Sequence, residues 1–201
     1  MDSVQQKPFT QYCENNKEPI HEVLRHYFSK AGDLLEIGSG TGQHSIYMSE
    51  KMPHLTWQAS DVAQNLAGIN AWGADNSHLS NWLPPIELDV NDEWPCSRYR
   101  YVYSANTLHI ISWQEVEAFF AGVNKVLMQQ GRVCIYGPFK YDGQFTTLSN
   151  AEFDVWLKSR NPLSGVRDFE ALNKLAESLG WTLLADEAMP ANNQCLIWQK
   201  A

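Results

Sequence analysis

Apolar residues recur with helical spacing in one segment near the start of the chain. Positions i, i+3, i+4, i+7 and i+8 are all apolar, which is the pattern of one buried face of an α-helix. They are occupied by Ile20, Val23, Leu24, Tyr27 and Phe28. We expect this helix to begin at Pro19, because proline suits the first helical turn. Gly32 is expected to end it.

Beyond this helix, short apolar runs typical of buried strands alternate with helical patterns. The strand-like runs are residues 34–37, 55–60, 86–88, 101–104 and 132–136. The helices predicted between them are residues 43–53, 62–74 and a segment that the capping-box residues Ser112 and Glu115 open and Gly131 ends. Strands separated by helices indicate a parallel sheet with helices on both faces.

The end of the chain departs from this alternation. A predicted helix, residues 168–179, leads into two strand-like runs, 181–188 and 194–199, with the turn 190–193 between them. Two strands joined by so short a turn are antiparallel, because a parallel pair needs a crossover of about a dozen residues. The fold class is therefore α/β. We predict a single domain, residues 1–201, with a doubly wound, mostly parallel seven-stranded sheet and a C-terminal antiparallel hairpin.

The charge balance argues against a nucleic-acid partner. The chain has 15 basic and 23 acidic residues, a net charge of −8, and its cations are scattered. An acidic surface without a basic cluster is repelled by phosphate backbones. No apolar run approaches the roughly 20 residues that a membrane helix needs, and Met1–Phe9 lacks the layout of a signal peptide. We expect a cytoplasmic protein with a small molecule or an uncharged protein surface as its partner.

The four cysteines give no sign of a metal site. They lie far apart, and none forms a C-x-x-C pair, so we expect no zinc cage. Cys134 and Cys195 fall in apolar strand-like runs, and we expect both to be buried reduced thiols.

A glycine-rich loop follows the first strand-like run. Gly38–Gly42 reads G-x-G-x-G and comes just after Glu36. Glycines allow positive φ and a close approach of backbone to a ligand, and the helix after the loop favours an anionic group. A dinucleotide site would have a third glycine where Gln43 stands, and a phosphate-binding P-loop would continue with Lys. A tight turn that packs helix against strand is the alternative.

Two aspartates stand at the ends of the next two strands. Asp61 lies 19 residues beyond Gly42 (61 − 42) and Asp89 ends the third strand. In doubly wound sheets, ligands lie outside these carboxyl ends, where an acidic residue accepts hydrogen bonds from ribose hydroxyls. Either aspartate alone also suits a helix cap or a turn. The combination with the glycine loop predicts a nucleoside site.

The run Leu34–Gly42, together with Asp61, Asp89 and the terminal hairpin, resembles class I S-adenosylmethionine-dependent methyltransferases. More narrowly, the chain is similar to a small methyltransferase-like family of unknown function over nearly its whole length. The marks of that family are residues 16–20, 104–110, 136–139, 149–150 and 165–168.

The resemblance implies that the cofactor is S-adenosylmethionine, with S-adenosylhomocysteine (SAH) as product. The loop from Glu36 to Gly42 would hold the methionine part, Asp61 the ribose, and Asp89 with Val90 the adenine. Ser104–Asn106 would run under the sulfonium. The expected cofactor-binding residues are Asn16, Glu36, Gly38, Ser39, Gly40, Gly42, Asp61, Val62, Asp89, Val90 and Ser104.

Two residues after the fourth strand are candidates for catalysis. His109 is placed to remove a proton from the acceptor; the alternatives are a helix cap or packing beneath the cofactor. Asn106 is a candidate for orienting the acceptor. The Asn/Asp/Ser-Pro-Pro-aromatic run of base-amino methyltransferases is absent, which argues against DNA adenine methylation.

Two segments are expected to enclose the acceptor. Residues 138–150 form a loop long enough to be functional, so we predict an acceptor-site lid over residues 138–168. Residues 1–30 are expected to form a cap on the other side. Arg160 and Arg167 are candidates for holding an acidic acceptor, with surface salt bridges as the alternative.

We therefore expect a methyltransferase with a small-molecule acceptor, its oligomeric state undetermined. The alternative is a catalytically silent protein that binds the cofactor as a sensor or partner subunit, since no acidic base follows the fourth strand. A nicotinamide oxidoreductase conflicts with Gln43 and with the terminal hairpin.

Overall fold

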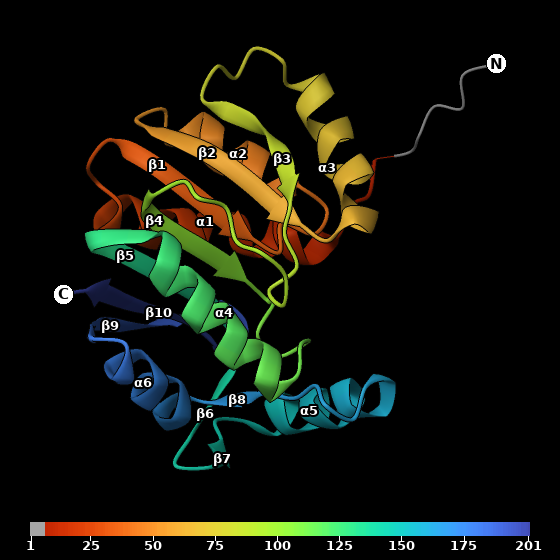
Figure 1. Ribbon diagram of the computed structural model, residues 1–201. Coiled ribbons are helices and arrows are strands. Elements are labelled where there is room, and N and C mark those ends of the chain that lie inside the picture. Colours follow the sequence, from red (N-terminus) through yellow and green to blue (C-terminus); the bar gives the residue numbers. More distant parts are fainter. Residues whose placement is uncertain (1–6) are drawn as a thin grey trace.

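A seven-stranded sheet forms the centre of the molecule in the computed structural model, which describes residues 7–201 (Figure 1). The strands lie in the order β3-β2-β1-β4-β5-β10-β9. β1 to β5 are parallel, and β10 is antiparallel to both β5 and β9. Their bounds are β1 Gly32–Ile37, β2 Leu55–Asp61, β3 Trp82–Glu87, β4 Tyr99–Ala105, β5 Leu127–Gly137, β9 Trp181–Met189 and β10 Asn193–Lys200. The predicted fold class is confirmed.

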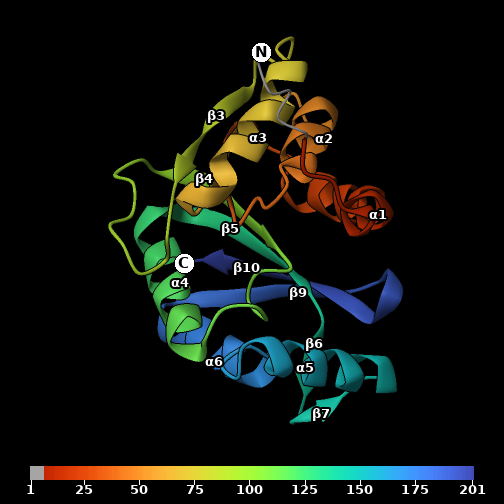
Figure 2. The same ribbon diagram turned by 90° about the vertical axis from the view of Figure 1, so that its right-hand side faces the viewer.

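Helices cover both faces of the sheet (Figure 2). One face carries α1 Gln11–Tyr27, α2 Gln43–Lys51 and α3 Ala63–Asp75; the other carries α4 Trp113–Val126 and α6 Phe169–Ser178, with α5 Leu148–Arg160 beyond them. Each face has its own apolar core, one that includes buried residues of α1 and α2 and one that includes buried residues of α4 and α6. The turn between β9 and β10 is a short 3-10 helix, Pro190–Asn192.

The capping box that the sequence predicts at the start of α4 is present. The Ser112 hydroxyl accepts from the Glu115 amide at 3.2 Å, and the Glu115 carboxylate accepts from the Ser112 amide at 2.6 Å. The expected end at Gly131 is wrong. α4 ends at Val126, because Leu127 already has extended backbone angles and begins β5.

The first helix is longer than its apolar pattern suggests. Thr10, not Pro19, precedes it, and the Thr10 hydroxyl accepts from the Tyr12 amide. Pro19 lies inside α1. The helix ends at Tyr27, and Gly32 belongs to β1. The prediction of a start at Pro19 was wrong because the added turns, residues 11–18, carry no apolar stripe.

Residues 138–150 are not a loop. They contain β6 Phe139–Tyr141, β7 Gln144–Phe145 and the start of α5. β6 pairs with β7 and, through a contact distant in sequence, with β8 Arg167–Asp168. This small sheet lies beside α5 at one end of the molecule (Figure 1). The segment predicted as a lid is therefore ordered structure with its own pairing.

The described residues also bear on the cysteine and membrane expectations. Cys134 and Cys195 are free and buried, as expected. No helix within residues 7–201 has the length and apolar character to cross a bilayer.

Candidate functional site

The glycine loop turns sharply at the carboxyl end of β1. Gly38, Gly40 and Gly42 have φ values of 73°, 57° and 86°, in the left-handed region that other residues rarely adopt. The amides of Gly38 and Ser39 both donate to the Ser60 carbonyl at 3.0 Å, which ties the loop to β2. A Cβ added at Gly40 meets nothing within 4 Å, so the loop faces open space there.

Gly38 also fixes the loop against the segment after β4. A Cβ on Gly38 would lie 2.5 Å from Thr107 Oγ1. Gly38→Ala is therefore expected to lower the free energy of unfolding by about 2 kcal/mol, partly through backbone strain and partly through the clash. Urea unfolding measures this. Adding Thr107→Ala is expected to restore the steric part alone; a double variant no more stable than Gly38→Ala contradicts the contact.

Asp61 joins the glycine loop to the start of α3. Its side chain is 7% exposed. Oδ2 accepts from the Gly40 amide at 2.6 Å, and Oδ1 accepts from the Val62 amide and the Asn65 side chain, both at 2.8 Å. A carboxylate has about four acceptor positions. One position remains for a further donor.

Asp89 lies near Asp61 at the same edge of the sheet. The Leu88 amide donates to the Asp61 carbonyl at 2.9 Å, which brings the two strand ends together. The Asp89 carboxylate accepts from the amide and the side chain of Asn91 at 2.9 and 3.0 Å. Asp89, Val90 and Val62 are all partly exposed, so their side chains are accessible at this edge.

Glu36 and Ser104 point into the protein rather than outward. Glu36 is 2% exposed and accepts from Trp57 Nε1 at 2.8 Å. Burial raises the pKa of its carboxyl to about 7, against the lowering effect of hydrogen bonds from Trp57 and Ser39. The Ser104 hydroxyl is fully buried and donates to the Ile37 carbonyl at 2.8 Å. Both stay predicted cofactor residues, and their described contacts are internal.

Asn16 reaches the site through a chain of buried side chains that the sequence did not reveal. Asn16 Oδ1 lies 2.7 Å from His44 Nε2, and His44 Nδ1 lies 3.3 Å from the Tyr103 hydroxyl. Burial lowers the pKa of His44 to about 4, so the ring is neutral at pH 7. A neutral ring fits this chain when Nε2 donates to Asn16 and Nδ1 accepts from Tyr103. The chain ties α1 to α2 and β4.

The segment before α1 lies across α3 and α2. Lys7 pairs with Asp75 at 2.6 Å, and the Pro8 carbonyl accepts from Trp72 at 2.8 Å. The Thr10 amide donates to Gln43 Oε1 at 2.7 Å. Residues 7–10 thus bridge α3 and the start of α2 beside the glycine loop. Residues 1–6 of the predicted cap lie outside the described residues.

Asn106 and His109 follow β4, as predicted, but differ in accessibility. Asn106 is partly exposed, has a φ of 57°, and donates its amide to the Tyr136 carbonyl at 2.9 Å. His109 is 6% exposed and packs edge-to-face against Phe153 with ring centroids 5.1 Å apart. Burial, with the charge of Arg167, lowers the pKa of His109 to about 4. His109 is therefore neutral at pH 7.

Neither arginine considered for an acidic acceptor is placed to hold one. Arg167 donates to the carbonyls of Leu108, Ile111 and Leu163. Arg160 lies over the Trp156 ring, with 4.3 Å from its guanidinium carbon to the ring centroid. The alternative of surface salt bridges does not describe these contacts either.

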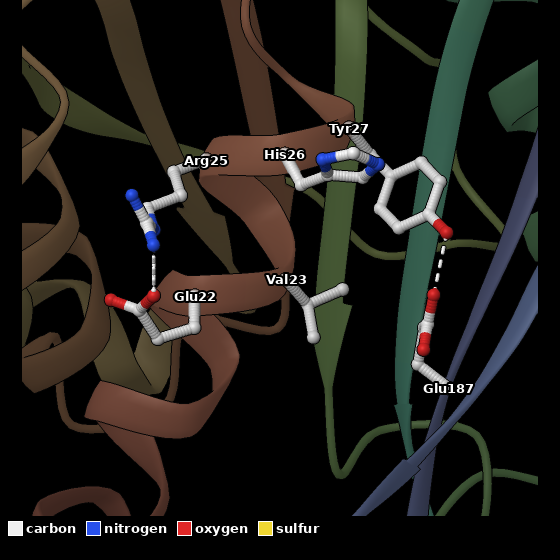
Figure 3. Close-up of a pocket in the computed structure, with 6 residues that line it drawn as sticks. All are labelled: Glu22, Val23, Arg25, His26, Tyr27 and Glu187. Carbon is white, nitrogen blue, oxygen red and sulfur yellow. Dashed lines mark hydrogen bonds and ion pairs between the residues drawn. The ribbon is translucent and has the colours of Figure 1, made fainter.

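A separate groove of about 480 Å³ lies along the last turns of α1 (Figure 3). Its walls are Glu22, Val23, Arg25, His26, Tyr27 and Glu187. Tyr27 donates to Glu187 at 2.5 Å, and this bond raises the pKa of Tyr27 to about 12. At 1.5 Å per residue, the groove is roughly 15 Å along α1 from the turn that meets the glycine loop. It is not part of the predicted cofactor site.

Comparison with known families places this architecture. The model of the family described as "Protein of unknown function (DUF938)" matches residues 7–200. The chain belongs to this family. Membership agrees with the resemblance seen in the sequence and assigns no activity.

Solved structures with the same fold are S-adenosylmethionine-dependent methyltransferases and O-methyltransferase family proteins. An O-methyltransferase family protein from Burkholderia thailandensis is similar at a TM-score of 0.81 and 14% identity, over 92% of this chain and 56% of that one. A family 2 O-methyltransferase from Planctomyces limnophilus, in complex with apigenin, has a TM-score of 0.82 and 15% identity, over 94% and 58%.

A third similar structure contains the product of the cofactor. CalO1, a methyltransferase in calicheamicin biosynthesis in its SAH-bound form, has a TM-score of 0.71 and 18% identity, over 85% of this chain and 49% of that one. The chain thus spans between about half and three-fifths of the length of these proteins. At these identities the likeness establishes the fold.

Proposed function

We propose that this DUF938 protein is a methyltransferase that uses S-adenosylmethionine and acts on a small-molecule acceptor. One observation carries the proposal. The Gly40 amide donates to Asp61 Oδ2 at 2.6 Å, which joins a glycine loop and an acidic residue at the carboxyl edge of β1 and β2. Ligands of doubly wound sheets bind at this edge. The fold shared with S-adenosylmethionine-dependent enzymes supports the choice of cofactor.

The residues at this edge fit such a cofactor. The open space at Gly40 admits a ligand, and the remaining acceptor position of Asp61 suits a ribose hydroxyl. Asp89 and Val90 are accessible for an adenine edge, and Val62 for the ring face. In this proposal Glu36, Ser39 and Ser104 support the loop from behind, and Asn16 holds α1 over it through His44.

The bound cofactor supplies an activated methyl group, which passes to a nucleophile while the carbon–sulfur electron pair stays on sulfur. The chain must align the acceptor and take up any proton that it releases. We assign alignment to Asn106, whose strained backbone places it at the end of β4. We assign proton uptake to His109, which is neutral at pH 7 and therefore has a free lone pair.

One observation favours the alternative of a silent cofactor-binding protein. A histidine whose pKa is lowered to about 4 is a weak base, and the proposed catalytic role requires the acceptor or cofactor to change its surroundings. Methyl transfer from labelled donor into a metabolite extract, followed by mass spectrometry, separates the two functions. A labelled product establishes catalysis; its absence across extracts favours the silent protein.

Cofactor binding is tested by thermal unfolding with ligand present. At 100 times Kd, SAH or S-adenosylmethionine is expected to stabilise the fold by roughly 2.7 kcal/mol. For a chain of this size, Tm rises by about 5–10 °C. NADH at the same concentration is the control and is expected to leave Tm unchanged. A shift with NADH and none with either sulfur ligand contradicts the proposal.

A further inference from the structure

Gln194 lies at the same edge of the sheet as the proposed cofactor site. It is near the start of β10 and pairs with Gly137, the last residue of β5. Directly opposed residues of antiparallel strands point to the same side of a sheet. Two and four residues along β10, Leu196 and Trp198 belong to the core that includes α4 and α6. The Gln194 side chain therefore rises on that face.

The carbonyl oxygen of this side chain has no partner. Within residues 7–201, Gln194 Oε1 is the one buried side-chain oxygen or nitrogen without a hydrogen bond. A buried acceptor loses its hydration and gains nothing in return. Such groups are rare in native proteins and call for a specific explanation. A donor supplied from outside the chain provides one.

Space for that donor lies over Gly137. A Cβ on this residue would stand 3.6 Å from His109 Nδ1 and 3.9 Å from the Phe139 ring. Because glycine has no side chain, the room between Gln194 and His109 stays free of one at this point. Phe153, packed against His109, adds an apolar wall.

The charged side chains around His109 already have partners inside the chain. Arg167 donates to three backbone carbonyls. The Asp154 carboxylate accepts from Lys158 at 2.6 Å and from the Val166 amide at 2.8 Å. The polar groups left over are an amide oxygen and an imidazole, both neutral, so this space favours an uncharged ligand.

We propose that Gln194 selects the methyl acceptor: its Oε1 accepts a hydrogen bond from an O–H or N–H group of an uncharged molecule whose apolar part lies against Phe153. The inference rests on the proposed function, because it takes this space as the acceptor site. Gln194 is a specificity residue here, and His109 remains the residue proposed to take the proton.

The test uses the SAH-loaded protein and three small aromatic probes of similar size. Phenol carries a donor, anisole lacks it, and benzoate carries a negative charge. Binding is followed by ¹H–¹⁵N NMR, with the side-chain amide signals of Gln194 identified by their loss in Gln194→Met. Methionine matches glutamine in shape and removes the oxygen. Gln199→Met is the matched control, because Gln199 Oε1 on the same strand accepts from Arg132 at 3.2 Å.

Phenol is expected to shift the Gln194 signals, and its Kd to rise about fivefold in Gln194→Met and not at all in Gln199→Met. Anisole should bind both proteins alike, and benzoate should bind at least tenfold more weakly than phenol. Without ligand, Gln194→Met is expected to match or exceed the wild-type Tm, whereas Gln199→Met lowers it.

A lower Tm for Gln194→Met would show that Gln194 Oε1 has a structural partner and would overturn the inference. Phenol binding that ignores Gln194, or equal loss of phenol and anisole, overturns it as well. Failure of SAH to bind the wild-type protein is a separate result and overturns the proposed function itself.

Discussion

Asp61→Ala is expected to raise the Kd for SAH by roughly 30- to 100-fold while the protein stays folded. The substitution removes the charged acceptor proposed for a ribose hydroxyl and the partner of the Gly40 amide. Hydrogen bonds to charged groups contribute about 1.5–3 kcal/mol each, and every 1.4 kcal/mol is about a tenfold change in Kd. Isothermal titration calorimetry measures the affinity, and far-UV circular dichroism checks the fold.

Two further variants sharpen this test. Asp61→Asn keeps an acceptor oxygen and loses the charge, so its Kd is expected to lie between those of wild type and Asp61→Ala. Asp92→Ala removes an exposed carboxylate from the loop after β3 and should leave the Kd within about twofold. If Asp61→Ala binds SAH as tightly as wild type, Asp61 is not in the cofactor site.

Glu36→Gln is expected to remove a pH-dependent loss of stability. The folded protein holds the proton of Glu36 up to a pKa of about 7, against a usual value of 4.5. Between these values the folded state binds more protons than the unfolded state, so stability falls as pH rises. The loss is on the order of 3 kcal/mol and is complete above pH 7. Glutamine at this position does not ionise.

Urea unfolding of both proteins from pH 4.5 to pH 8 measures the effect. The free energy of unfolding of Glu36→Gln, relative to wild type, should increase by about 3 kcal/mol across this range. His44 and His109 have the opposite sign, because their lowered pKa values favour the fold above pH 6.5 and that contribution is lost as pH falls toward 4. They are common to both proteins and cancel in the difference.

The control for this series is Glu87→Gln, which changes an exposed carboxyl at the end of β3. It is expected to alter the free energy of unfolding by less than about 0.5 kcal/mol at every pH. A Glu36→Gln difference that stays constant with pH would show that the buried carboxyl does not titrate in this range.

Local patterns predicted the elements whose cause is local. The capping box at Ser112 and Glu115, the alternation of strands and helices, and the turn before β10 each depend on residues close together in sequence. The errors arose where distant contacts decide. Residues 11–18 are helical without an apolar stripe, and they contact the glycine loop and α2 through Thr10, Cys13 and Asn16. β6 exists because it pairs with β8, 28 positions further on (167 − 139).

The candidate site shows the same division. The glycine loop and Asp61 could be found from the sequence, because spacing after consecutive strands places them at one edge. The burial of His109 and the engagement of Arg167 with carbonyls depend on how α5 and its neighbours pack, which no local pattern encodes. His44, Tyr103 and Gln194 carried no signal in the sequence beyond being polar residues in or beside apolar segments.

The position of β10 has a consequence for the growing chain. This strand lies inside the sheet between β5 and β9, yet it is translated after all the others. Until residues 193–200 leave the ribosome, the edge of β5 is an unpaired template and β9 has no place to dock. The nascent protein is therefore exposed to mispairing with other chains through most of its synthesis.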